Sequence, residues 1–173
     1  MGQSIDLQLI RLRTGVKMGS REVINDTLVN LFNEILKLEE DVLVNGEFQN
    51  ISVNDFHVIN AIGIDEKDIK NMSTIAKQLD ITVGSLTTAI NALVRKGYVS
   101  RERSEKDRRV VTVKLTELGE RAYHHHRDFH EHMTDAAVRA LKADELPMVT
   151  KVLIGLQKFF RDYKQNELPK DGE

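Results

Sequence analysis

Apolar positions recur every three or four residues through most of the chain, which is the pattern of amphipathic helices. One such face, on a helix expected over residues 21–44, carries Leu28, Phe32, Ile35 and Val42. A second helix is expected from its N-cap, Ser52, to Ile62, with Gly63 closing it. The only prolines are Pro147 and Pro169, and their scarcity also favours a helical protein.

The middle of the chain is patterned differently, as two short helices followed by two strands. Ser73 is expected to cap a helix that ends near Leu79, and a second helix is expected over residues 83–96. Strands are then expected over residues 98–103 and 110–115, because apolar and polar residues alternate in the second of them. Two long helices complete the pattern, capped by Thr116 and Asp144 and reaching about residues 141 and 166.

These elements predict a mainly α protein with a small antiparallel β wing. We expect a domain of short helices and a strand hairpin over residues 49–116, between long helical segments at residues 21–48 and 117–166. Residues 1–20 are interpreted as a leader and residues 167–173 as a tail.

Composition excludes several classes of protein. The chain has no cysteine, which excludes disulfide scaffolds, thiol catalysts and thiolate-bound metals. It has no run of 18 apolar residues, so we expect no membrane span and a cytoplasmic location. The net charge is −2 overall, but residues 72–116 carry nine Lys/Arg and four Asp/Glu, a local balance of +5. A local positive surface is what phosphate binding requires.

The helix over residues 83–96 has the side chains that suit a DNA major groove. It is expected to bury Leu86, Ile90, Leu93 and Val94 and to present small hydroxyl and amide groups outward. The strand turn that follows holds several cations, which suits a minor groove. We therefore predict DNA contacts from Ser73, Thr82, Ser85, Thr87, Thr88, Asn91, Arg95, Arg103, Lys106, Asp107, Arg108 and Arg109.

The stretch from Ser73 to Gly119 resembles the winged helix-turn-helix core of the MarR family of transcriptional regulators. The family marks are Asp107-Arg108-Arg109 in the wing and Leu115-Thr116 after it, and the resemblance covers about residues 21–165. It implies a winged helix-turn-helix domain over residues 49–116 and a homodimer formed by the dimerisation helices at residues 21–48 and 117–166. The two recognition helices of the dimer would contact successive major-groove turns of double-stranded operator DNA.

Within that family, the runs at residues 83–88, 95–98 and 103–111, with Phe129-His130, most resemble repressors of fatty-acid synthesis genes. This closer resemblance implies a long-chain acyl group, delivered on acyl carrier protein, as corepressor. An apolar tunnel for the acyl chain would then run between the helices that bear Phe32, Ile35, Ile59 and Phe129.

Polar side chains also interrupt the apolar faces of the long helices. Glu39 stands within the face of the first helix, His57 borders that of the second, and His126 and His130 lie in and beside that of the helix after the wing. His124, His125 and His132 are expected to be solvated. A buried carboxylate needs partners, so we expect a Glu–His hydrogen-bond network or, as the alternative, a zinc site formed by these four residues.

The same four residues stand where zinc-sensing members of the family place ligands, although those sensors also use a cysteine that this chain lacks. A third reading has the cluster hold an acyl thioester or sense pH. Two other classes of protein remain, a metal hydrolase built on this cluster and a purely structural helical protein. The first lacks a His-Glu-x-x-His run and a Gly-rich phosphate loop, and we expect no enzymatic activity.

Overall fold

The computed structural model describes residues 19–44, 46–65, 70–103 and 111–167, and the expected leader lies almost wholly outside them. The backbone divides into two compact units, one ending at Glu131 and one beginning at His132. In the described residues, no helix is both long enough and apolar enough to cross a membrane.

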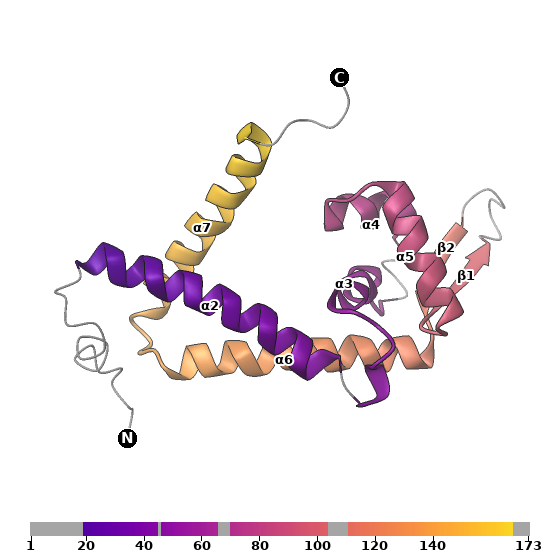
Figure 1. Ribbon diagram of the computed structural model, residues 1–173, viewed down its shortest axis with the longest axis horizontal. Helices are drawn as coiled ribbons and strands as arrows, with labels where there is room; N and C mark the ends of the chain where they lie inside the picture. Colours follow the sequence, from indigo (N-terminus) through magenta and orange to yellow (C-terminus); the bar gives the residue numbers. More distant parts are fainter. Residues whose placement is uncertain (1–18, 45, 66–69, 104–110, 168–173) are drawn as a thin grey trace. The chain divides into compact units, whose positions relative to one another are not determined.

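The first unit contains the expected winged helix-turn-helix order (Figure 1). Its elements are α2 (Ser20–Leu43), the 3-10 turn η1 (Gly46–Phe48), α3 (Val53–Ile62), α4 (Met72–Leu79), α5 (Val83–Arg95), β1 (Val99–Arg103), β2 (Val111–Leu115) and the first part of α6 (Glu117–Arg139). The two strands pair antiparallel, with Val99 opposite Leu115 and Arg103 opposite Val111. The predicted fold class is therefore confirmed.

The core of this unit lies among α3, α4, α5 and the strands. Phe56, Ile59, Ile75 and Tyr98 are almost completely buried there. The Tyr98 hydroxyl donates a hydrogen bond of 2.7 Å to Asn50 Oδ1, so its polar end is satisfied. A Cβ at Gly119 would lie 2.1 Å from the Tyr98 carbonyl oxygen, so only glycine allows α6 to begin so close to β1.

The termini of these elements agree with most of the predicted caps. Ser52 Oγ accepts from the Asp55 amide, Thr116 Oγ1 accepts from the Gly119 amide, and Gly97 follows α5 with a φ of 84°. Ser73 as an N-cap is wrong, because Asn71 Oδ1 accepts from the Thr74 amide at 2.9 Å and places Ser73 inside α4.

The second unit contains the end of α6 and the helix α7 (Leu146–Glu167). The expected start of α7 at Asp144 is early, because the carbonyl of Glu145 accepts the first helical hydrogen bond, from Val149. Pro147 lies in the first turn, as expected. Phe159 packs beside Phe160 and Tyr163, with ring centroids 5.6 and 5.8 Å away.

Candidate nucleic-acid interface and buried histidine–glutamate cluster

Helix α5 is anchored to the core along one face. Leu86, Ile90 and Leu93 are fully buried, whereas Val94, which we expected in the core, is about one-third exposed. At the C-terminus of the helix, Lys96 Nζ donates to Asp55 Oδ2 at 3.0 Å. Asp55 also accepts from the Ser52 amide at 3.0 Å, so this ion pair ties the end of α5 to the first turn of α3.

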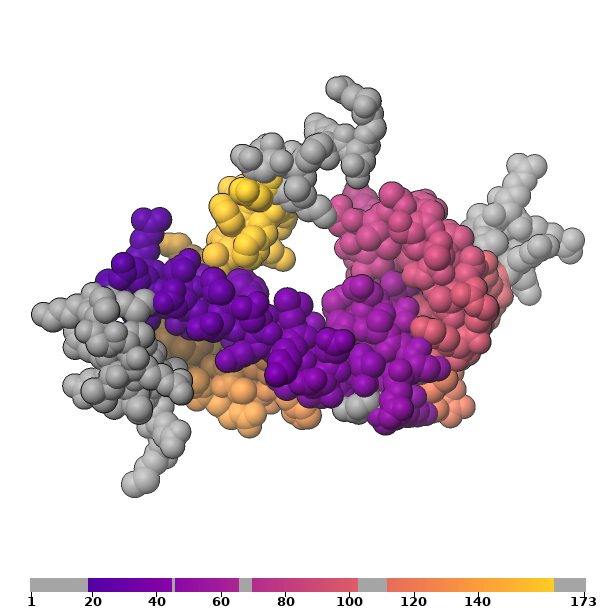
Figure 2. All heavy atoms as spheres, in the orientation of Figure 1, coloured from indigo at the N-terminus to yellow at the C-terminus, as the bar shows by residue number. Residues whose placement is uncertain are grey.

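The opposite face of α5 is exposed and polar. Ser85, Thr88, Asn91 and Arg95 are exposed, and Thr87 is half-buried at the edge of this face. In the space-filling view, α4 and α5 form part of the surface of the first unit (Figure 2). The chain therefore presents the face that the sequence predicts for DNA, and the individual contacts stay predictions.

The hydroxyl groups on this helix are already engaged within it. Thr82 Oγ1 accepts from the Ser85 amide at 3.0 Å and lies 2.9 Å from Ser85 Oγ. Thr87 Oγ1 donates to the Val83 carbonyl at 2.7 Å, and Thr88 Oγ1 donates to the Gly84 carbonyl at 3.2 Å. The bonds to the two carbonyl groups fix the direction of the Thr87 and Thr88 hydroxyl hydrogens, whereas either oxygen of the Thr82–Ser85 pair can be the donor.

The hairpin lies next to α5 (Figure 1), and its strands hold more charge on their outer surface. Arg101 and Glu102 are exposed, and Glu102 Oε2 forms an ion pair with Lys114 Nζ at a distance of 2.8 Å. The tip itself lies outside the described residues, and so do Lys106, Asp107, Arg108 and Arg109. Of Arg103 the structure describes the backbone, at the end of β1, and Ser73 is exposed on α4.

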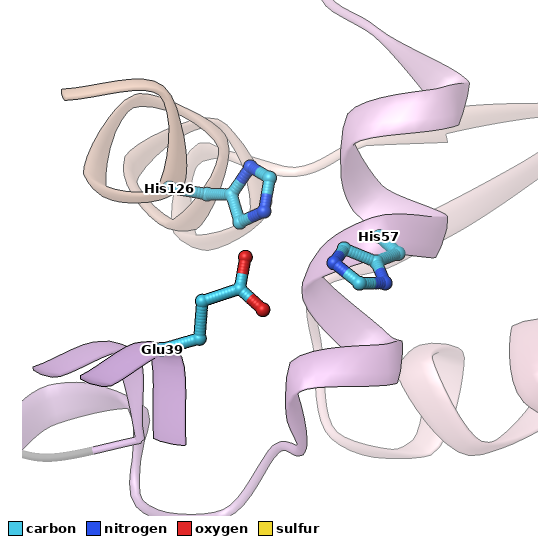
Figure 3. Close-up of side chains that lie close together, drawn as sticks. All are labelled: Glu39, His57 and His126. Atoms are coloured by element: carbon cyan, nitrogen blue, oxygen red, sulfur yellow. The ribbon is translucent and has the colours of Figure 1, made fainter. Parts of the chain in front are cut away.

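Glu39, His57 and His126 come together from three helices, α2, α3 and α6 (Figure 3). Glu39 and His126 are buried, with 5% and 4% of their surfaces exposed, and His57 is partly exposed. One donor atom from each lies within 4.8 Å of the others, and the Glu39 carboxylate reaches into the space between the two rings (Figure 3). The inward orientation predicted for Glu39 and His126 is confirmed.

His130 joins this cluster from the next turn of α6. Its Nε2 lies 3.2 Å from His126 Nε2 and 3.4 Å from Glu39 Oε1. Burial, with a smaller contribution from the neighbouring imidazoles, lowers the pKa of His126 from 6.5 to about 4. His126 is therefore neutral at pH 7. Its Nε2 can accept a hydrogen bond from His130 Nε2 or bind a metal ion.

His125 is not solvated as we expected. Its ring lies 5.1 Å from that of Phe48 and 6.1 Å from that of Phe56, and its Nε2 is 3.3 Å from the Val42 carbonyl oxygen. Phe48 lies in the 3-10 turn η1, which brings its ring against His125. No periodic pattern in the sequence predicts this turn. His124 and His132 are exposed, in agreement with the expectation.

An open cavity of about 710 Å³ extends from the cluster along α2 and α3. It is lined by Glu39, His57, Asp55 and Lys96, together with Leu36, Glu40, Val44 and residues 49–54. Phe32, Ile35, Ile59 and Phe129 are not part of this lining; Ile59 is completely buried and Phe32 is 45% exposed. An acyl-chain tunnel among those four residues stays a prediction.

The fold and the exposed α5 face together define a winged-helix protein of the nucleic-acid-binding class. A family model described as transcriptional regulator SarA/Rot matches residues 46–125. The crystal structure of Streptococcus pneumoniae FabT in complex with DNA is 36% identical, with a TM-score of 0.74, and the match covers 84% of this chain and all of that one. The chain belongs to the SarA/Rot/MarR-type family of winged-helix transcriptional regulators.

Other relatives agree with this assignment. The transcriptional regulator YpoP of Bacillus subtilis is 30% identical over 106 residues, which cover 61% of this chain and 64% of that sequence. SarZ of Staphylococcus haemolyticus is 34% identical over 40% of this chain. The chain spans about half to two thirds of the length of these two curated relatives. The adhesin competence repressor of Streptococcus pyogenes, at 23% identity and a TM-score of 0.60, covers 82% of this chain and 98% of its own, and shows the same fold.

Proposed function

We propose that this chain is a repressor that binds operator DNA through α5 and the adjoining hairpin. The observation that carries the proposal is the exposed polar face of α5, which lies beside a hairpin whose sequence is rich in cations. The opposite face of the helix is apolar and buried in the core, so the helix is fixed in this orientation. Family membership and the 36% identity to FabT, whose structure holds DNA, support the same role. A gel-shift assay with double-stranded promoter fragments tests this proposal. The purified chain should shift the fragments, and the shift should weaken as the salt concentration rises.

The repressor would act as a homodimer. Large apolar side chains remain exposed on α2, where Ile24 and Leu36 are 60% and 65% exposed, and on α7, where Met148, Leu153 and Ile154 are at least 60% exposed. Exposed apolar side chains gathered on a helix are typical of interaction surfaces, which supports a dimer formed through these helices. A sedimentation experiment tests the dimer, and a monomer at micromolar concentration would contradict it.

The genes under control would be those of fatty-acid biosynthesis, with long-chain acyl-acyl carrier protein as corepressor. The similarity to FabT supports this regulon, together with the motif runs that the sequence shares with fatty-acid repressors. The acyl chain requires an apolar pocket, and its carrier protein would be a partner of the repressor.

A second candidate, favoured by the geometry of the histidine–glutamate cluster, is a zinc-responsive repressor. Zinc bonds to imidazole nitrogen and carboxylate oxygen measure about 2.0–2.2 Å, so tetrahedral ligand atoms lie about 3.3–3.6 Å apart. Glu39, His57 and His126 offer donor atoms within 4.8 Å of one another, and His130 stands beside them. Small side-chain rotations would close the site around an ion.

One gel-shift series separates the two effectors. If acyl groups act, acyl carrier protein with a long acyl chain raises operator affinity and the bare carrier does not. If zinc acts, a chelator lowers operator affinity and added zinc restores it. His126→Gln should abolish the zinc response only, and His124→Gln, an exposed position on the same helix, serves as the matched control.

A further inference from the structure

The N-terminal half of α5 exposes apolar groups where a groove-reading helix usually offers hydrogen-bond donors. Val83, the first residue of the helix, is 46% exposed, and Ile81 in the preceding turn is 40% exposed. Gly84 adds no side chain, and nothing but Thr82 Oγ1, at 3.7 Å, would lie near a Cβ there. This end of the helix therefore exposes two aliphatic side chains, beside the hydroxyl groups of Thr82 and Ser85.

The hydroxyl groups of Thr87 and Thr88 do not act as donors toward a ligand. A hydroxyl group has one hydrogen and can accept two further bonds. The hydrogens of Thr87 and Thr88 go to the carbonyl oxygens of Val83 and Gly84. What these side chains can offer a ligand is therefore a methyl group and an oxygen that only accepts.

Such a surface discriminates among base pairs in the major groove. Guanine shows two acceptors there, N7 and O6, and needs donors, which the hydroxyl groups of Thr87 and Thr88 do not offer. A thymine–adenine pair shows the thymine C5-methyl group and the adenine N6 amino donor, which match a methyl group and an accepting oxygen. Side-chain donors also lie further along, at Asn91 and Arg95, which are exposed in the C-terminal half of α5.

We propose that Val83, Thr87 and Thr88 determine specificity by contacting thymine C5-methyl groups, with the threonine hydroxyls acting as acceptors. This inference rests on the proposed DNA-binding function and specifies which groups of the base pairs the helix contacts. Val83, which was absent from the sequence-based contact set, becomes one of the contacts. The half-site facing this end of α5 is then rich in thymine, and guanine is disfavoured there.

The experiment begins with selection of binding sites from random duplexes by the full-length chain. The selected duplex is then made with 2′-deoxyuridine in place of one thymine at a time, which removes only the C5-methyl group. Loss of one buried methyl contact should weaken binding about fourfold, as expected for about 0.8 kcal/mol per methyl group. One or two thymines in each half-site should show this loss.

Two variants identify the side chain. Thr88→Ser removes the methyl group and keeps the hydroxyl, and it should weaken binding and make one thymine position insensitive to deoxyuridine. Thr88→Val keeps the branched shape and similar helix propensity, and it should preserve the deoxyuridine effect. Thr134→Ser, exposed on α6 in the second unit, is the control that should change nothing. Circular dichroism shows whether each variant folds.

The outcomes distinguish the inference from the function on which it rests. If the wild-type chain binds selected duplexes but no deoxyuridine substitution alters affinity, the methyl-reading inference is wrong and DNA binding stands. The same conclusion follows if Thr88→Val loses the thymine preference while Thr88→Ser keeps it. If the folded chain enriches no duplex, the proposed function fails and the inference with it.

Discussion

The buried imidazole of His126 should make the stability of the protein depend on pH. The pKa of His126 falls from 6.5 to about 4 in the folded chain, mainly because burial penalises the charged ring. Between these two values the unfolded chain binds a proton that the folded chain does not. The stabilising contribution of neutral His126 is thus complete above pH 6.5 and is lost as the pH falls toward 4.

The size of this effect follows from the difference between the two pKa values. One pKa unit corresponds to about 1.36 kcal/mol, so the free energy of unfolding should fall by about 3 kcal/mol between pH 7 and pH 4 because of this residue. In the His126→Gln variant the residue at this position does not titrate, so that part of the decline should disappear. Ionisable groups that do not contact His126 titrate equally in both proteins and cancel in the comparison.

The assay is urea unfolding of the wild-type chain and of His126→Gln at several pH values, at one protein concentration and with a chelator present. It gives one curve of unfolding free energy against pH for each protein. The wild-type curve should approach that of His126→Gln as the pH falls from 6.5 to 4. His124→Gln, which alters an exposed histidine two residues away, should follow the wild-type slope. Parallel curves for wild type and His126→Gln over this range would refute the argument from burial.

Three further changes test the packing and the interface. Gly119→Ala should destabilise the protein by about 1–3 kcal/mol in urea unfolding, because its Cβ would lie 2.1 Å from the Tyr98 carbonyl oxygen; Gly155→Ala, with open space around it, should be neutral or slightly stabilising. Gly84→Ala should raise stability by up to about 1 kcal/mol yet weaken duplex binding in fluorescence anisotropy, and unchanged binding would show that no base approaches that backbone. Arg95→Gln should lower the slope of log affinity against log salt by about 0.9 per phosphate contact, and an unchanged slope would exclude a phosphate contact.

The helical framework could be predicted because its signals are local. Periodic apolar residues marked α2, α3 and α5, and the caps at Ser52 and Thr116 formed as expected. The N-cap of α4 was misplaced because Asn71 and Ser73 are both favourable capping residues two positions apart. Only the backbone direction before the helix decides between such neighbours.

The cluster could be predicted in part. Helical periodicity placed Glu39 and His126 on buried faces, and the structure shows them there. The packing of His125 on Phe48 and Phe56 could not be foreseen, because it depends on a 3-10 turn that has no periodic signature. The cavity along α2 and α3 likewise depends on how helices distant in sequence pack together.

The most direct test of the account is selection of random duplex DNA by the purified chain, followed by footprinting of the enriched sequence. We expect an inverted repeat with two protected half-sites about 10–10.5 base pairs apart and two chains bound per duplex. Failure to enrich any sequence, or binding that ignores both sequence and salt, would contradict the assignment of α5 as a recognition helix.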